Sequence, residues 1–170
     1  MATEFEPDEL RLLYRAARAL LEECDYGELL DRLLDVTIEG LGAERGFVVV
    51  RDHSAAGPAF RAAVARNYRS DKLDEAEQQV SSSISGAVLA EGQALLIEDA
   101  LDSRFSDKPS VQRLGLRSVL CAPLAAGTEA FALLYLENRD ISRRFTERHR
   151  QLLNEISALA APRLRAALAI

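Results

Sequence analysis

The sequence predicts an α+β protein: an antiparallel sheet of five or six strands with the helices of both chain ends on one face. Apolar residues recur at helical spacing near both ends of the chain, whereas residues 45–66 and 118–138 contain the alternating and β-branched runs typical of strands. Strands joined by short turns form antiparallel hairpins, so the sheet is expected to be antiparallel. At 170 residues the chain has the size of one domain.

Two helices are expected before the first strand. The first begins at EPDEL, where Pro7 suits an opening turn, and the second begins at Asp25, which with Glu28 resembles a capping box. Glycines 40 and 42 are expected to end the second helix. The first helix has a narrow apolar seam with 3-4-3-4 spacing, which favours contact with a second copy, although packing within one subunit stays open. The seam consists of Leu10, Leu13, Ala17, Leu20 and Cys24.

The strands follow in the middle of the chain. GFVVV predicts a central strand that pairs, through SAAGP, with AFRAAVARN. The polar segment YRSDKLDEAEQQ predicts a loop, and a short helix capped by serines follows and stops at Gly92. ALLIED predicts a short strand, and Pro109 and Gly115 bound another short helix. RSVLCAPL and EAFALLYLEN then form a hairpin.

Thr146 is expected to cap a last helix that contains Pro162 and has no stop signal. We therefore expect one domain: a coupling and dimerisation helix at 1–24, a core at 25–160, and at 161–170 the start of a helix that continues in a longer parent protein. The inserts between 69 and 116 should roof the free face of the sheet and enclose a ligand pocket.

Composition narrows the classes of partner. The net charge is −6, which argues against nucleic acid or an anionic membrane as the main partner. The N-terminus lacks the basic start and apolar core of a signal peptide, and no uncharged run approaches a membrane span, so a cytoplasmic location is expected. The two cysteines and two histidines are scattered, which predicts no metal site.

Several segments together resemble a GAF domain, the small-molecule-sensing module of bacterial signalling proteins and cyclic-nucleotide phosphodiesterases. The resemblance covers about residues 25–160 and depends on the order and spacing of LLDRLLDVTIEGLGAERGFVVVRD, SSSISGAVLAEGQALLIEDALDSRFS, SVQRLGLRSVLCAPL and ALLYLENR followed by FTERHRQLL. Two of these phrases look most like the GAF domains of sigma-factor-dependent transcriptional activators and sensor kinases. A PAS domain, the related alternative, fits the paired N-terminal helices less well.

The resemblance implies a ligand pocket on one sheet face, a helical layer on the other, and a homodimer through terminal helices that lead to an output domain. Candidate ligand contacts are polar or aromatic residues expected near the pocket, although each also has a local structural explanation. They are Asn67, Asp99, Arg104, Phe105, Ser118 and Tyr135.

The chemistries found in other GAF domains fit less well. Cys121 alternates with Ser118, Leu120 and Ala122 in a strand and has no basic neighbour on its own strand, so it is expected to be buried and inert. Sulfoxide reductases of this family depend on several cysteines. Cyclic-nucleotide binders carry an acidic pair after Phe, where this chain has His149 and Arg150.

We therefore predict a regulatory domain that is not an enzyme, has no cofactor, and binds an unidentified small molecule. A dimerisation module whose interior is filled by its own side chains is the first alternative. Cyclic-nucleotide binding and a reductase of methionine sulfoxide follow.

Overall fold

The computed structural model describes residues 4–52, 59–68, 75–100, 106–107, 109–127, 129–140 and 144–168. Its sheet consists of β1 (Arg45–Asp52), β2 (Ala59–Arg66), β3 (Leu95–Ile97), β4 (Ser118–Ala126) and β5 (Glu129–Asn138). The order is β2-β1-β5-β4-β3 and every pairing is antiparallel. The predicted α+β class and antiparallel sheet are confirmed, with five strands in the described part of the chain.

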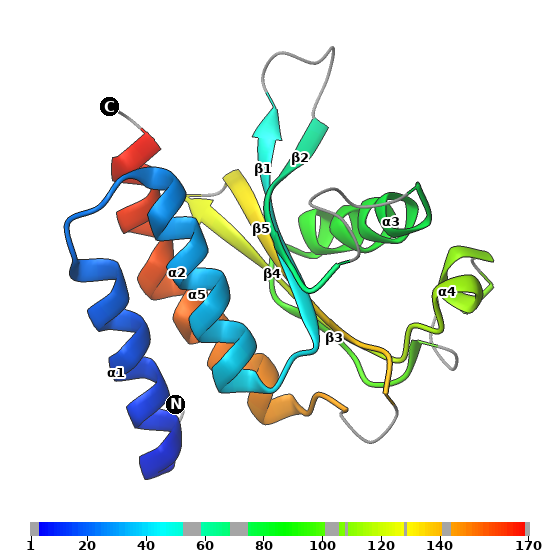
Figure 1. Ribbon diagram of the computed structural model, residues 1–170, viewed down its shortest axis with the longest axis horizontal. Helices are drawn as coiled ribbons and strands as arrows, with labels where there is room; N and C mark the ends of the chain where they lie inside the picture. The colour runs from blue at the N-terminus through cyan, green and yellow to red at the C-terminus, as the bar shows by residue number, and fades with distance from the viewer. Residues whose placement is uncertain are drawn as a thin grey trace.

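One face of the sheet packs against α2 (Tyr26–Leu41) and α5 (Glu147–Leu168), and α1 (Pro7–Leu21) packs on the outer side of these two helices, as Figure 1 shows. The Asp25 side chain caps α2 by accepting the N–H of Glu28 at 2.9 Å. Gly42 ends α2 with a left-handed φ of 68°. Gly40 instead lies inside α2, where it lets Leu12 of α1 approach: a Cβ there would meet Leu12 Cδ1 at 2.2 Å.

The opposite face, which we call the roof face, lies under α3 (Glu75–Glu91) and α4 (Pro109–Leu114), as Figure 1 shows. α4 is bounded by Pro109 and Gly115 as predicted. The expected loop before the serines is wrong, because residues 75–80 already belong to α3 and the serines lie inside it. Glu, Ala and Gln are good helix formers, and Ile84 and Val88 anchor the helix in the roof-face core.

The seam predicted on α1 is only partly buried. Its Leu20 packs in the core, Leu13 and Ala17 are half-buried, and Leu10 is 53% exposed. The fully buried face of α1 is formed instead by Leu12, Ala16 and Leu20. α1 therefore leaves an apolar stripe uncovered on its outer side.

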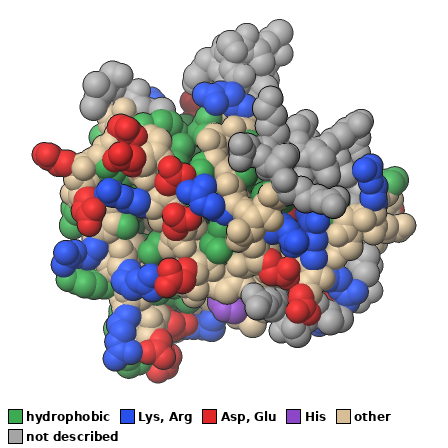
Figure 2. All heavy atoms as spheres, in the orientation of Figure 1, with side chains coloured by type: hydrophobic (Ala, Val, Ile, Leu, Met, Phe, Trp, Pro, Cys, Tyr) green, Lys and Arg blue, Asp and Glu red, His purple; other side chains and the backbone are tan. Residues whose placement is uncertain are grey.

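None of the helices in the described ranges has the length and apolarity that a membrane span requires. Figure 2 shows basic and acidic side chains interspersed over one face of the molecule. The last helix continues past Pro162, and Leu164, which follows it, is fully buried in the core.

Candidate functional site

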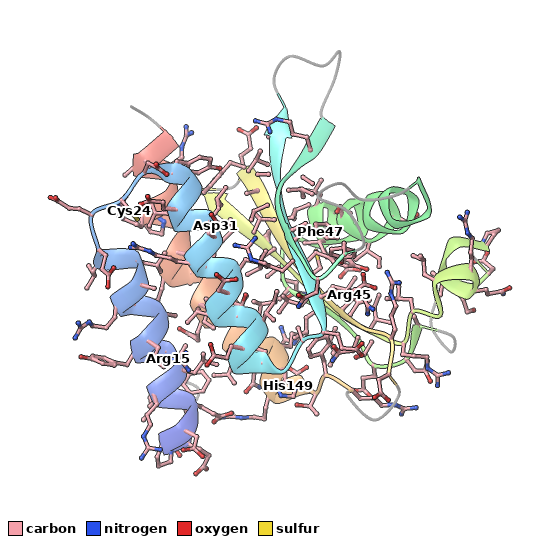
Figure 3. The ribbon with its side chains drawn as sticks, in the orientation of Figure 1. Arg15, Cys24, Asp31, Arg45, Phe47 and His149 are labelled. Atoms are coloured by element: carbon pink, nitrogen blue, oxygen red, sulfur yellow. The ribbon has the colours of Figure 1, made fainter. Side chains whose placement is uncertain are left out.

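The roof face carries a cluster of aromatic side chains. Phe47 of β1 and Tyr135 of β5 are opposite each other in the sheet, and their rings stack with centroids 4.4 Å apart at 16°. Tyr68, just after β2, adds a third ring 5.9 Å from that of Phe47. Figure 3 labels Phe47 on the side of the sheet that faces α3. Phe47 and Tyr135 are 1% and 2% exposed, so these rings form part of the packed roof-face core.

A carboxylate lies at the end of this cluster. Glu137 follows Tyr135 on the same face of β5 and is 2% exposed. The Tyr68 hydroxyl donates to Glu137 Oε1 at 2.6 Å. Arg139 donates to the same carboxylate, from Nη2 to Oε1 at 3.3 Å and from Nε to Oε2 at 3.4 Å. Glu137 is thus a buried charge with a charged partner and a hydroxyl donor.

Tyr68 also joins the end of β2 to β5. It stands two residues after Arg66, the last residue of β2, and its hydroxyl bond reaches across 69 residues of sequence. We name Phe47, Tyr68, Tyr135, Glu137 and Arg139 the aromatic–carboxylate cluster.

Cys121 of β4 lies opposite Tyr135 on the roof face and is fully buried. Burial raises the pKa of its thiol to about 12, so thiolate is scarce near neutral pH. The predicted alternation in β4 is confirmed, since Val119 and Cys121 pack in the roof-face core and Leu120 and Ala122 in the helix-face core. Within the described ranges, no three His, Cys, Asp or Glu side chains group closely enough to hold a metal ion.

Of the predicted ligand contacts, the structure puts Tyr135 in this cluster. Asn67 is exposed, in the left-handed conformation with φ of 69°, and its amide donates to the carbonyl of Glu44 at 2.9 Å. Asn tolerates this conformation better than most residues, so Asn67 serves the turn that positions Tyr68.

Asp99 and Ser118 have structural partners. Asp99 Oδ2 accepts Arg117 Nη2 at 2.9 Å and Arg144 Nη2 at 3.2 Å. Ser118 alternates with Val119 and faces the helices instead of the roof, which corrects the expectation that it could face the pocket. Its hydroxyl donates to the carbonyl of Ile97 at 3.1 Å and accepts the N–H of Phe145 at 3.0 Å. Arg104 and Phe105 lie outside the described residues.

The motif that cyclic-nucleotide binders share is half present here, and its residues have structural roles. Asn138 Oδ1 accepts the N–H of Glu44 at 2.6 Å, which fastens the end of β5 to the start of β1. Arg139 pairs with Glu137, and Phe145 is buried in the helix-face core. These contacts give Asn138, Arg139 and Phe145 structural roles at the end of β5 and before α5.

Sequence reasoning missed Tyr68 and Glu137. Glu137 had a detectable signal, because a carboxylate two residues beyond Tyr135 in an otherwise apolar strand must lie on the same face. Tyr68 had none, since it stands in a polar segment whose path depends on the turn at Asn67.

The antiparallel sheet, the helices on one face and the roof on the other define the class as a single α+β domain. The family model of the GAF domain matches residues 25–164. The chain therefore belongs to the GAF family, whose members are regulatory sensor modules of signalling proteins. No curated protein matches the sequence.

Solved structures share this fold at low sequence identity. The GAF domain of an Acinetobacter phosphoenolpyruvate-protein phosphotransferase is 16% identical, with a TM-score of 0.75 and 98% of both chains covered. The nlh2 GAF domain of A. aeolicus, in an inactive state, is 21% identical, with a TM-score of 0.67 and coverage of 94% and 96%. Free methionine-R-sulfoxide reductase from Neisseria meningitidis, in complex with its substrate, is 15% identical, with a TM-score of 0.74 and coverage of 100% and 98%.

Proposed function

We propose that this GAF domain is a noncatalytic cytoplasmic sensor that binds a small molecule between α3 and the roof face. The observation that carries the proposal is the aromatic–carboxylate cluster, in which Tyr68, just after β2, donates a 2.6 Å bond to buried Glu137 of β5. A bound molecule that displaces or reinforces this bond changes the position of the roof. Binding is then a conformational event in the domain.

The chemistry of the cluster favours an uncharged, flat ligand. Three aromatic rings supply stacking surface, whereas the charges of Glu137 and Arg139 compensate each other. A charged ligand would lose its hydration, and neither Glu137 nor Arg139 would be free of its own partner to replace it. Arg104 and Phe105 remain predicted ligand contacts. Asn67 and Asp99 are proposed to support the site indirectly, Asn67 through its turn and Asp99 through its ion pairs.

Thermal unfolding in the presence of a metabolite library tests ligand binding. A ligand at 100 times its Kd stabilises the folded state by about 2.7 kcal/mol, which gives a clear shift in Tm. Hits should lose their shift in Tyr68→Ala and keep it in Tyr26→Ala, a matched change at a tyrosine at the start of α2 that packs on the opposite, helix-face core. Hits that persist in Tyr68→Ala would move the site away from this cluster.

The signal is proposed to leave through a homodimer of the terminal helices. On α1, Leu10, Tyr14 and Leu21 are 53%, 62% and 79% exposed, and with half-buried Ala17 they follow 4-3-4 spacing. On α5, Leu159 is 46% exposed. A second copy that covers this stripe would bury apolar side chains that one subunit leaves in water. The output domain would be joined to these helices in the parent protein, a signalling or transcription-regulatory protein.

Molar mass in solution tests the dimer. Leu21→Glu should shift the mass toward that of a monomer, because the most exposed apolar side chain of the stripe, at its C-terminal end, would be replaced by a charge. Leu89→Glu is the matched control, since Leu89 is 37% exposed on α3, away from the stripe. A wild-type chain that is monomeric at high concentration, or equal masses for both variants, would count against the dimer.

One observation favours the ligand-free dimerisation module as a second candidate. The roof-face core is densely filled, with Ile84, Val88 and Leu116 each at most 1% exposed. If no compound in the library shifts Tm while the mass of the dimer persists, this second function is the correct one. Cyclic nucleotides and free methionine sulfoxide belong in the same library, which tests the remaining alternatives directly.

A further inference from the structure

The first turn of α5 is capped by a histidine. Thr146 precedes the helix, and its N–H donates to Nδ1 of His149 at 2.9 Å. In return the N–H of His149 donates to Thr146 Oγ1 at 3.5 Å. This is the reciprocal geometry of a capping box, in which position N3 is usually Glu or Gln. Here the acceptor at N3 is an imidazole nitrogen, which can be lost by protonation.

Only one form of the imidazole serves this role. Nδ1 accepts a hydrogen bond when it carries no proton, which requires the neutral ring with its proton on Nε2. Protonated histidine presents a donor at both nitrogens, so Nδ1 would face the N–H of Thr146 donor to donor, and the Thr146 hydroxyl, 3.2 Å from Nδ1, would have to turn from donor to acceptor. The helix would then lose the acceptor at its first turn, and the neighbouring segment would have to rearrange.

The cap is continuous with the sheet. The imidazole packs edge-on against Phe145, with centroids 5.9 Å apart at 82°. Phe145 is buried, and its N–H is held by Ser118, whose hydroxyl also binds the carbonyl of Ile97. The bond that His149 would lose therefore lies beside the Ser118 contacts that attach the start of α5 to β3 and β4.

The same turn also holds α1. Arg148 donates from Nε to Glu9 Oε2 at 3.0 Å, pairs through Nη2 with Glu9 Oε1, and lies over the ring of Phe5. His149 thus lies between the bond to the sheet and the ion pair to α1. The lower part of Figure 3 labels His149 beside this end of the helical layer.

Burial and one charged group act on the pKa of His149 in opposite directions. Within the described residues, Glu9 of α1 is the charged group that acts on His149, and it favours protonation. Glu39 of α2 pairs with Arg15, Glu147 of α5 pairs with Arg150, and β3 and β4 present the neutral contacts described above. Burial is the larger effect and lowers the pKa of His149 below its ordinary value of 6.5.

We propose that His149 is a proton-sensitive cap that joins α5 and α1 to the sheet when neutral and loosens that joint when protonated. This role does not depend on ligand binding. It concerns the stability of the contacts that attach α5 and α1 to the sheet. Because the folded state binds this proton less readily than the unfolded chain, stability from the cap is present above pH 6.5 and is lost as pH falls below it.

Histidine NMR and amide exchange test the proposal on the whole chain. His149 should titrate below 6.5 with its neutral proton on Nε2, and the protection factor of the Thr146 amide should fall by up to about tenfold per pH unit between pH 6.5 and that pKa. His149→Gln is the matched control, because Gln at N3 keeps an acceptor that does not titrate. Its Thr146 amide should keep constant protection.

His53→Gln removes the only other histidine and simplifies the assignment. Three results would overturn the proposal: a neutral proton on Nδ1, titration at or above 6.5, or the same loss of protection in wild type and His149→Gln. If His149→Gln does not fold, the tautomer and the titration of wild type still decide the question.

Discussion

Removing the Tyr68 hydroxyl is the most direct test of the aromatic–carboxylate cluster. Tyr68→Phe keeps the ring beside Phe47 and deletes only the donor to Glu137. A hydrogen bond to a charged group contributes about 1.5–3 kcal/mol, and a buried acceptor left underpaired adds a desolvation cost. The Arg139 donors stay, but at 3.3 and 3.4 Å they are longer than ordinary charge-assisted bonds.

We expect the free energy of unfolding to fall by about 1.5 kcal/mol, the lower end of that range, because Arg139 keeps part of the interaction. Urea unfolding followed by circular dichroism measures it. With m near 2 kcal/mol/M, the midpoint should move by about 0.7 M. The matched control is Tyr14→Phe, whose hydroxyl accepts Arg18 Nη1 at 3.2 Å on the surface. Tyr14→Phe should cost less than about 0.5 kcal/mol. Equal effects of the two changes would refute the assignment of Tyr68 as a structural donor to a buried charge.

Two further predictions follow from packing and burial. Gly46→Ala should destabilise the fold by about 1–3 kcal/mol in the same urea assay, because its Cβ would lie 2.7 Å from Leu136 Cδ2 and 3.0 Å from the carbonyl oxygen of Tyr135; an unchanged midpoint would mean that β1 and β5 separate easily there. A thiol reagent should modify Cys24 quickly in the native protein and leave Cys121 untouched, because the pKa of Cys121 is raised to about 12 and its side chain is buried. Cys24→Ser should abolish fast labelling; rapid reaction that remains in this variant would show that the roof opens readily.

The strand pattern could be predicted because each strand is a short alternating or β-branched run between clear turn signals. The same pattern could not tell which face of β4 meets the helices. Both faces are apolar, with Val119 and Cys121 on one side and Leu120 and Ala122 on the other. Alternation therefore divides the residues of β4 into two sets, but it does not tell which set faces the helices and which faces the roof. For this reason Ser118 was expected near the pocket and is instead found under α5.

The extent of α3 and the polar part of the site depend on tertiary contacts. Residues 75–80 show no apolar face of their own, so a loop was the natural expectation, and the core contacts of Ile84 and Val88 support the helix instead. The bond between Tyr68 and Glu137 spans 69 residues, and no local pattern encodes it. Aromatic residues at strand positions were visible in the sequence, but their stacking partners were not.

The contacts around α5 explain how a roof and a helical layer on opposite faces can act together in the proposed function. Asp99, which follows β3, pairs with Arg144 just before α5. Ser118 joins the carbonyl of Ile97 in β3 to the N–H of Phe145. Both links pass the end of the sheet, so α5 need not sense a ligand through the packed strands. In the proposed function, a rearrangement of the roof that moves Asp99 would shift α5 through Arg144. α1 would then move with α5, because Arg148 of α5 pairs with Glu9 of α1.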